Sequence, residues 1–414
     1  MRKSGSNCLV CTNNNLNQII DFGMMALAGG FLLEKDIPSE KKFQMRLSFC
    51  NNCYSLQITD IIDKNKMFNN YFYFSSAIGT LKEHFNKYAL EVSNRFLETP
   101  SDSTVLEIGC NDGVLLKPLS KIGIGNLIGV DPAENVINSI SDINAHLING
   151  YFGDSISQKI LQKFGKIDII CANNVYAHLS NFKEVTRAIS NLISKDGVFI
   201  FEVHYIEKII NEIQYDMIYH EHLFYHSYLS LQKHFEQYGM HIFDIKPIDI
   251  HGGSMRYYVS NVNSIKHKQS NKVEELCRSE TNKGYNKLKT FEEFSFKVKE
   301  HKKEFSQLIR KLKSENHTIA GYGASGRANT LIQYCGLDST TIDYIIDDAP
   351  QKSGFLTPGS HIPIFDRTHL SEVQNPDYLI IFAWSFFEEI HLRIKEIISD
   401  KTKIILPFPK IKII

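Results

Sequence analysis

A glycine-rich turn between two apolar runs is the feature that most constrains this chain. Residues 105–113 read Val-Leu-Glu-Ile-Gly-Cys-Asn-Asp-Gly, and the next apolar run ends on an acid, in Ile-Gly-Val-Asp131. We expect a strand from Ser103 to Ile108, a helix from Val114 to Lys121 and a second strand from Asn126 to Val130. This order opens a doubly wound α/β nucleotide-binding fold, in which glycines let the backbone approach the ligand and the acid grips ribose hydroxyls.

The turn carries an acid at its head and lacks the close-packed glycines that wrap a pyrophosphate. Its pattern is Glu-x-Gly-x-Asn-x-Gly rather than Gly-x-Gly-x-x-Gly. Such a turn suits a ligand with an adenosine and a cationic centre but no phosphate, and S-adenosyl-L-methionine (SAM) fits this description. The pattern therefore favours a methyltransferase over a NAD-type Rossmann half or a structural turn. The candidate cofactor residues here are Glu107, Gly109, Asn111, Gly113 and Asp131.

The composition is that of a soluble globular chain with two or three domains. Its 414 residues include 46 basic and 46 acidic side chains, so the formal net charge is zero. This balance argues against broad nucleic-acid binding, which needs a basic face, but it permits a local basic pocket. Neither a signal peptide nor a membrane-length apolar run is visible, so we expect a cytoplasmic protein without a membrane partner, and we favour a monomer.

Two Cys-x-x-Cys pairs lie near the N-terminus. Cys8 and Cys11 form the first pair, and Cys50 and Cys53 form the second. Four thiolates from two such turns match tetrahedral Zn²⁺, and with sulfur in every position no site stays open for a catalytic water. The motif therefore predicts a structural zinc ion. Redox cysteines and a nucleic-acid-binding ribbon are the alternatives, and the neutral charge disfavours the ribbon.

The chain divides into three segments. Residues 1–65 hold the cysteine pairs, residues 66–300 hold the first glycine turn, and residues 301–414 begin with a second strand–turn–helix unit. A charged stretch with apolar residues at helical spacing, 271–315, predicts one or two long helices between domains. We expect an α/β protein with a zinc-binding domain, a central Rossmann-like methyltransferase domain and a second Rossmann-like domain at the C-terminal end. Further strand candidates lie at 17–22, 43–49, 167–172, 197–203, 240–248 and 255–259, the last two as an antiparallel hairpin.

Two clusters of polar residues carry candidate chemistry. Asn173-Asn174-Val-Tyr-Ala-His178 follows the fourth strand, at the edge where open α/β sheets bind ligands. Asn173 and Asn174 are SAM-binding candidates, although a loop cap explains one of them, and His178 points either into the cleft or into solvent. Tyr219-His220-Glu221-His222 is the densest titratable run. Imidazole, with a pKa of about 6.5, is a natural general base at neutral pH; the alternative is a polar surface run.

Together these motifs resemble the bacterial nucleotide-sugar C-methyltransferases, the family that includes the tetronitrose 3-C-methyltransferase and acts on nucleotide-linked keto-deoxysugars. The resemblance implies the three domains above, a nucleotide-diphosphate sugar as substrate and His222 as the base. It places Tyr219, Glu221, His178 and Tyr73 around the sugar. His204 departs from the family pattern. The resemblance covers nearly the whole chain, through the cysteine pairs, Tyr71–Ser76, Glu107–Gly113, Asn173–His178, Ile218–Leu223, Gly252–Arg256 and Gly321–Thr330.

The expected reaction is methyl transfer to C3 of a 4-keto sugar. The ketone acidifies the proton at C3, which His222 removes, while Tyr219 and His178 are donors to the enolate oxygen. A sugar O- or N-methyltransferase of the same fold is the first alternative, because it needs only a base beside a hydroxyl or an amine.

A second glycine turn, Gly321-Tyr-Gly-Ala-Ser-Gly326, offers a cradle for the substrate's pyrophosphate. The candidate substrate-binding residues are Glu202, Arg256, Gly323, Ser325 and Arg327; for both arginines the alternative is a surface charge. The turn also fits a NAD-dependent sugar oxidoreductase, because a strand at 342–346 ends on two acids, Asp347 and Asp348. The intact first turn argues against that alternative.

Overall fold

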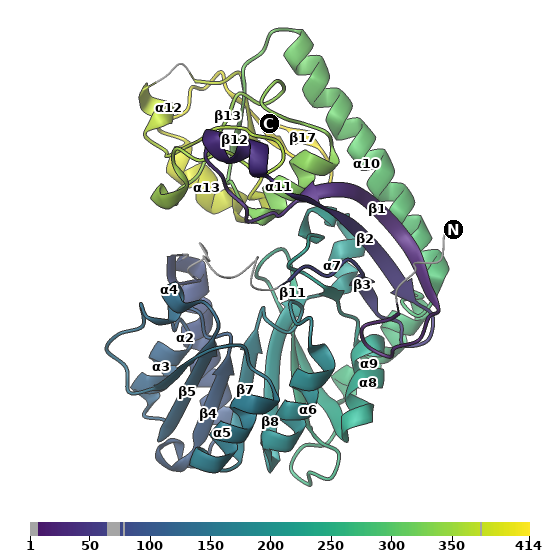
Figure 1. Ribbon diagram of the computed structural model, residues 1–414, viewed down its shortest axis with the longest axis vertical. Coiled ribbons are helices and arrows are strands. Elements are labelled where there is room, and N and C mark those ends of the chain that lie inside the picture. Colours follow the sequence, from purple (N-terminus) through teal and green to yellow (C-terminus); the bar gives the residue numbers. More distant parts are fainter. Residues whose placement is uncertain (1–6, 64–74, 78, 373–374) are drawn as a thin grey trace.

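The computed structural model describes residues 7–63, 75–77, 79–372 and 375–414. In these residues the strands form three sheets, of four, seven and six strands. Figure 1 shows the domain of the seven-stranded sheet below and that of the six-stranded sheet above. The N-terminal hairpin and helix α10 (Leu288–Ser314) run along one side of both.

The seven-stranded central sheet has the order β10–β11–β8–β7–β4–β5–β6. Five neighbouring strands are parallel, and β11 pairs antiparallel with both β8 and β10. The strand order reverses between β4 and β7, so their carboxyl ends form the crevice where such sheets bind ligands. The predicted doubly wound sheet with an added hairpin is confirmed. Its strands are β4 Thr104–Ile108, β5 Asn126–Asp131, β6 His146–Asn149, β7 Ile167–Asn173, β8 Ile193–His204, β10 Met240–Ile248 and β11 Ser254–Asn261.

Helices cover both faces of the central sheet. Alternate strand residues such as Val105 and Ile169 pack against α2 and α3, while their neighbours Leu106 and Ile170 join the core of the opposite face with α5, α6 and α8. This alternation follows because successive side chains of a strand point to opposite faces. The helices of this domain are α2 Gly79–Phe96, α3 Leu116–Ile122, α4 Glu134–Ile137, α5 Asp154–Phe164, α6 Phe182–Leu192, α7 Ile206–Asn211 and α8 Tyr228–Phe235.

The C-terminal sheet repeats the Rossmann-like pattern, as the sequence predicts. Its order is β14–β13–β12–β15–β16–β17, with β17 alone antiparallel. Helix α11 (Gly326–Tyr334) follows the glycine turn after β12. The other elements are β12 Ile319–Tyr322, β13 Tyr344–Ile346, β14 Ile364–Phe365, α12 His369–Glu372, β15 Tyr378–Ile381, α13 Phe387–Ile394, β16 Lys403–Leu406 and β17 Lys412–Ile413.

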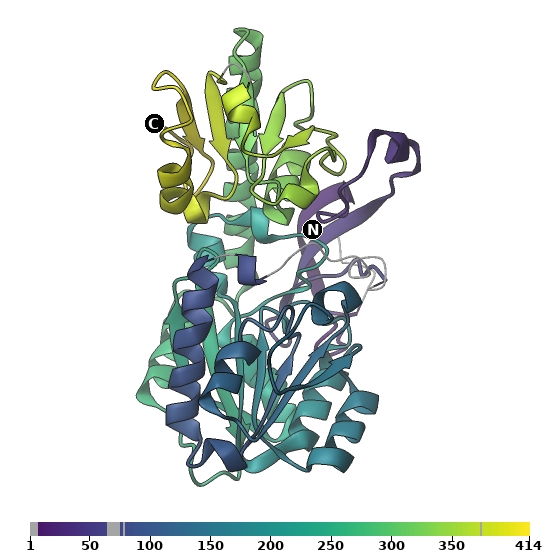
Figure 2. The ribbon, with the colours of Figure 1, turned by 90° about the vertical axis from the view of Figure 1, so that its left-hand side faces the viewer.

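The N-terminal sheet touches both other domains. It contains β1 (Leu16–Ala26), β2 (Lys42–Cys50) and β3 (Leu56–Ile58), and the short strand β9 (Phe224–Tyr225) from the central segment completes it. At its far end the β1–β2 hairpin reaches the C-terminal domain (Figures 1 and 2), where Leu32 forms a β-bridge with Leu356. We call residues 26–41 the hairpin arm.

Two helices connect the central and C-terminal sheets, as predicted for 271–315. They are α9 (Asn271–Asn282) and α10, and α10 runs across the expected domain boundary at residue 300. The boundaries at 65 and 300 stay predictions. None of the helices in the described ranges combines the length and the apolar character needed to cross a membrane.

Candidate active site

The first glycine turn follows β4 directly and packs against the loop after β7. Gly109 and Gly113 have φ angles of 70° and 76°, a backbone that glycine adopts without strain. A Cβ atom on Gly109 would lie 2.2 Å from Cγ2 of Val175, so any other residue would push the two loops apart. The Asp131 carboxylate accepts hydrogen bonds from the N–H groups of Asn111 (2.8 Å) and Ala133 (2.9 Å), which fixes the turn against the end of β5.

Buried polar atoms without a hydrogen-bond partner among the described residues gather at this edge of the sheet. They are Oε2 of Glu107, Oδ1 of Asp112, both side-chain amide atoms of Asn173 and Oδ1 of Asn174. Buried polar groups are normally paired, so this concentration fits a polar ligand. Burial, with Asp131 and Asp112 nearby, raises the pKa of Glu107 well above its usual value. The residue types and their placement fit the adenosine of SAM.

The predicted histidine run lies beside the loop after β7. The N–H groups of Leu223 and Phe224 donate to the carbonyl of Ala177, at 2.9 and 3.1 Å. The ring of His222 consequently lies 4.7 Å from that of His178, measured between centroids, and 4.1 Å from that of Tyr219. The structure thus brings together three of the predicted site residues at the edge that holds the glycine turn.

The hydrogen bond made by His222 defines its tautomer. Its Nδ1 lies 2.8 Å from the carbonyl oxygen of Met217. A carbonyl only accepts, so Nδ1 carries the proton and Nε2 of the neutral ring keeps its lone pair. The side chain is only 5% exposed. Burial, together with neighbouring His178, lowers the pKa of His222 well below its usual value, so the ring is neutral at neutral pH.

The other members of the run point elsewhere. His220 lies against the N-terminal sheet, with Nε2 3.4 Å from the carbonyl of Gln44. Glu221 faces the hairpin arm, where a Cβ on Gly29 would lie 3.2 Å from its Oε1. Burial raises the pKa of Glu221 to about 7. Tyr73, the remaining predicted catalytic residue, lies outside the described residues.

Glu202 and Arg256 bind each other, in contrast to their predicted role at the substrate. A guanidinium nitrogen of Arg256 lies 2.6 Å from Oε1 of Glu202, and both side chains are at most 2% exposed. The arginine also stacks over the ring of Tyr88, and Nε2 of His84 forms a hydrogen bond with Glu202. The β8–β11 register sets Arg256 opposite Glu202, so the two charges neutralise each other across the sheet. They join β8, β11 and α2.

The second glycine turn is a domain contact. A Cβ on Gly326 would lie 3.2 Å from Cζ of Tyr219, and Ser325 caps α11 by accepting from the N–H of Ala328 at 3.2 Å. Gly323 takes a φ of 96° where it packs against Ala383, in the turn that follows β15.

The acid after β13, Asp347, already has a cationic partner, whereas Asp131 pairs with none among the described residues. Lys352 donates to Asp347 at 3.1 Å and to the carbonyl of Ala324 at 2.8 Å. A ribose hydroxyl at this position would therefore meet a carboxylate that is already paired with a lysine. This arrangement argues against a NAD site.

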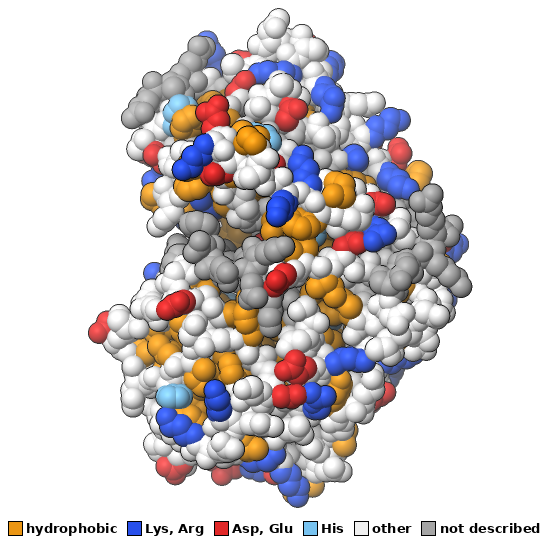
Figure 3. Space-filling model, viewed as in Figure 1, with side chains coloured by type: hydrophobic (Ala, Val, Ile, Leu, Met, Phe, Trp, Pro, Cys, Tyr) orange, Lys and Arg blue, Asp and Glu red, His pale blue; other side chains and the backbone are white. Residues whose placement is uncertain are grey.

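Arg327 links the central and C-terminal domains. Its Nε donates to Asp216 at 2.8 Å, and the indole of Trp384 donates to the same carboxylate at 3.0 Å. A second nitrogen lies 3.3 Å from the carbonyl of His251. The third, Nη2, is buried and has no hydrogen-bond partner among the described residues, which suits an anionic ligand at this boundary. Figure 3 shows the surface indented between the two domains.

Comparison with known proteins supports the enzyme activity. Three family models match in order: a "Putative zinc binding domain" at 8–68, a "Methyltransferase domain" at 81–244 and a "C-methyltransferase C-terminal domain" at 249–409. The chain is 29% identical over 408 residues to C-methyltransferase NovU of Streptomyces niveus, which covers 98% of this chain and 96% of NovU. The chain is a SAM-dependent C-methyltransferase.

Other relatives of this C-methyltransferase match only part of the chain. A ubiquinone biosynthesis O-methyltransferase of Azorhizobium caulinodans is 24% identical over 97 residues, 23% of this chain and 38% of that protein. A SAM-dependent methyltransferase structure from Clostridium acetobutylicum aligns with a TM-score of 0.35 and 17% identity, over 44% of this chain and 92% of that one.

The zinc site of this C-methyltransferase is formed by the four predicted cysteines. Their Sγ atoms all lie within 4.8 Å of one another, with Cys8 and Cys53 3.5 Å apart and Cys11 and Cys50 3.6 Å apart. Zn–S bonds of about 2.3 Å in a tetrahedron set sulfur atoms about 3.8 Å apart, so the geometry fits Zn²⁺. The buried Gln57 donates to Cys8 Sγ at 3.0 Å, as outer-shell partners of metal ligands do.

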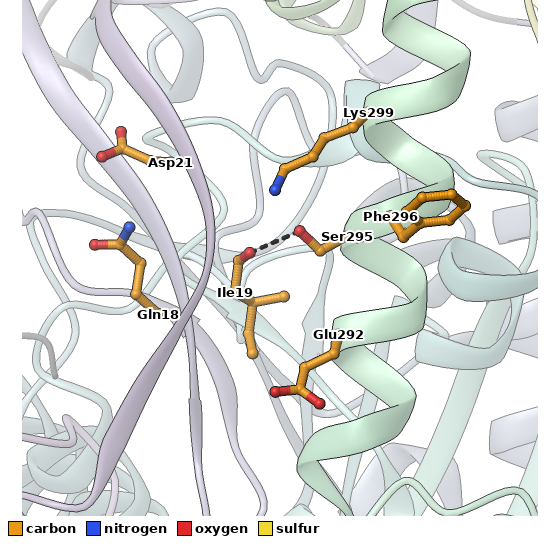
Figure 4. A pocket seen from close by; sticks show the side chains of 7 residues that line it. All are labelled: Gln18, Ile19, Asp21, Glu292, Ser295, Phe296 and Lys299. Carbon is orange, nitrogen blue, oxygen red and sulfur yellow. Dashed lines mark hydrogen bonds between the residues drawn. The ribbon is translucent and has the colours of Figure 1, made fainter. Parts of the chain in front are cut away.

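A separate hollow of about 350 Å³ lies between β1 and α10. Figure 4 shows Asp21 and Lys299 on its two sides and the hydrogen bond from Ser295 to the carbonyl of Ile19, which is 2.8 Å long. It holds none of the predicted site residues.

Several residues around the site were not predicted from the sequence. Asp112 was an unassigned position in the turn, and Asp216 showed no motif. Trp384 could have been noticed as the only tryptophan in the chain. His251 could have been noticed as a histidine beside a glycine pair in the hairpin turn.

Proposed function

We propose that this C-methyltransferase methylates a nucleotide-linked keto-deoxysugar at a carbon next to its ketone, C3 of a 4-keto sugar. The neutral imidazole of His222 carries the proposal, because its Nδ1 is held by the Met217 carbonyl and its Nε2 keeps a lone pair next to His178 and Tyr219. Transfer to carbon requires a base that removes a C–H proton, and an imidazole held in one tautomer is suited to that task. The name of the relative NovU agrees with carbon as the acceptor atom.

SAM would lie over the carboxyl ends of β4 and β5. When bound, it supplies an electrophilic methyl group on its sulfonium. Asp131 accepts two backbone N–H bonds, but carboxylate oxygens have further lone pairs, so the same group can accept from ribose hydroxyls. The proposed cofactor-binding residues are Glu107, Gly109, Asn111, Gly113, Asp131, Asn173 and Asn174.

The acceptor sugar would lie between His222 and the second glycine turn. His222 Nε2 takes the C3 proton, and the C–H electron pair becomes the enolate that attacks the methyl group. Tyr219 and His178 flank the base and are the proposed donors to the enolate oxygen. Glu221 has a raised pKa, which favours its protonated form, and it lines the proposed sugar site on the side of the hairpin arm.

The nucleotide would lie at the start of α11. Gly323 and Ser325 form the turn, and the buried Nη2 of Arg327 supplies a donor for the diphosphate. In this proposal there are three domains. The zinc-binding domain is residues 1–65, the domain that binds SAM is residues 66–300, and the domain that closes over the nucleotide-sugar is residues 301–414. Glu202 and Arg256 support the sheet and do not contact the substrate.

The test is to incubate the enzyme with SAM and either dTDP-4-keto-6-deoxy-D-glucose or its GDP counterpart, and to locate the new methyl group by NMR. We expect a methyl on C3 and loss of deuterium placed there. A methyl on oxygen or nitrogen would refute C-methylation of these sugars. A methyl on C5, the other carbon beside the ketone, would refute the C3 assignment and retain the enolate chemistry.

Replacing Asp131 with alanine should weaken SAM binding about 10- to 100-fold, because hydrogen bonds to a charged group contribute about 1.5–3 kcal/mol. Calorimetry measures the dissociation constant directly. Asp102→Ala, at an exposed position of the same domain, is the matched control and should bind SAM as the wild type does. Unchanged binding by Asp131→Ala would remove this residue from the site.

Replacing Gly326 with alanine should lower kcat about 5- to 100-fold without unfolding the protein. The added Cβ would press on Tyr219 from 3.2 Å, and small misplacements at a reacting centre are costly. Gly79→Ala is the control, because no atom of the residues that the structure describes lies within 4 Å of its added Cβ. Equal kcat values for the two variants, with equal melting temperatures, would show that this contact does not position Tyr219.

A further inference from the structure

Two histidines extend the row that begins at His222. His204 ends β8, and its ring centroid lies 5.2 Å from that of His222 and 5.9 Å from that of His251. His251 belongs to the turn between β10 and β11 and has a φ of 54°, which non-glycine residues rarely adopt. His222 is buried, whereas His204 and His251 are partly exposed. The row therefore runs from the base towards the domain boundary.

Methylation of carbon releases one proton in each turnover. The acceptor C–H and the sulfonium methyl become a C–CH₃ group, a neutral thioether and H⁺. In the proposed function, on which this inference rests, the proton is left on Nε2 of His222. Nδ1 already donates to the Met217 carbonyl, and a carbonyl is not a base, so the proton has to leave from Nε2.

The surroundings of His222 disfavour a retained proton. Burial and the neighbours His178, Arg327 and His251 lower its pKa. Burial also lowers the pKa of His204, and that of His251 to about 4, so both rings are neutral and can accept a proton on one nitrogen while releasing one from the other. The titratable and charged groups that face the row are His178, Tyr219, Arg327, Glu202 and His84.

We propose that His204 and His251 relay the proton from His222 to solvent at the domain boundary. His222 gives its Nε2 proton to His204, His204 releases a proton from its other nitrogen to His251, and His251 passes one to water. Centroid separations of 5.2 and 5.9 Å let ring nitrogens meet directly or through one water molecule. Both residues act through His222, so they are positioning residues for regeneration of the base.

The variants His204→Asn and His251→Asn test the relay in the full-length zinc enzyme. Asparagine keeps polarity and tolerates the left-handed backbone at 251, but it cannot relay. With dTDP-4-keto-6-deoxy-D-glucose and SAM, we expect the first turnover to keep its rate within about 2-fold, since His222 starts unprotonated. We expect steady-state kcat to fall about 10-fold or more and to recover with added imidazole. The double variant should match the slower single variant, because the two steps are in series.

The control is His146→Asn, an exposed histidine on β6, which should leave kcat unchanged. An unchanged kcat in His204→Asn, or an equal loss in first-turnover rate, would overturn the relay; the second result would indicate substrate contact. A wild type that makes no C-methyl product rejects the proposed function instead. In that case ¹⁵N-histidine NMR at an acidic pH, at which His222 carries a proton on Nε2, decides the relay: exchange of that proton with solvent should slow in His204→Asn, and an unchanged exchange rate would refute it.

Discussion

Replacing His222 with asparagine is expected to lower kcat about 10²- to 10⁴-fold, the usual contribution of a general base. Asparagine can still donate to the Met217 carbonyl but offers no lone pair of comparable basicity at the position of Nε2. Calorimetry should show SAM affinity within about 2-fold of the wild type, because His222 is not among the residues proposed to bind SAM. Steady-state methylation of a keto-sugar nucleotide measures the loss.

His220→Asn is the matched control, because it changes the same residue type two positions away. His220 contacts Gln44 and Phe43 of the N-terminal sheet, so kcat should stay within about 3-fold of the wild type, with a stability loss of about 1 kcal/mol. Methylation by His222→Asn at the wild-type rate would end the assignment of His222 as the base.

Replacing Cys53 with serine is expected to release zinc and abolish turnover. Structural zinc contributes about 10–16 kcal/mol of apparent binding free energy, comparable with the whole stability of a domain. Loss of the ion should unfold the N-terminal sheet and free the hairpin arm, which lies beside Glu221 and Gly326. Metal analysis, a thermal melt and a methylation assay on one preparation follow the three effects.

Cys277→Ser separates zinc loss from the general effect of losing a thiol. Cys277 is partly exposed on α9, distant in sequence from the four clustered cysteines. This variant should keep one zinc per chain, the wild-type melting temperature and full activity. A Cys53→Ser protein that retains zinc and melts like the wild type would show that the four thiolates do not hold a structural ion.

Local patterns in the sequence were sufficient for the fold and for locating the glycine turn that is proposed to bind SAM. The strand, glycine turn and acid around Gly109 are close together in the chain, and the strand periodicities depend on short-range sequence alone. The two cysteine pairs could also be recognised from the sequence, because ligation of zinc by four sulfur atoms restricts the spacing of the cysteines within each pair. The element bounds shifted by a few residues, as with β8, which begins at Ile193 rather than Gly197.

The acceptor side depends on contacts that no local pattern records. Arg256 meets Glu202 only because β11 returns beside β8 in one register. The side chains of Tyr219 to His222 diverge because another domain packs on each side of them. Arg327 finds Asp216 across the domain boundary. Such pairings follow from tertiary register, which a single sequence does not specify.

The hairpin arm gives the chain an order of assembly. The N–H of Ala26 donates to Oε1 of Gln333, 307 positions along the chain, and the Asn329 side chain donates to the carbonyl of Ala28. Contacts between such distant segments form late in folding. During synthesis, the seven-stranded central sheet can therefore be complete before the hairpin arm has made its contacts with α11 of the C-terminal domain. In the proposed function, an unfinished chain would thus bind the methyl donor without enclosing an acceptor, and the enolate would form only in finished molecules.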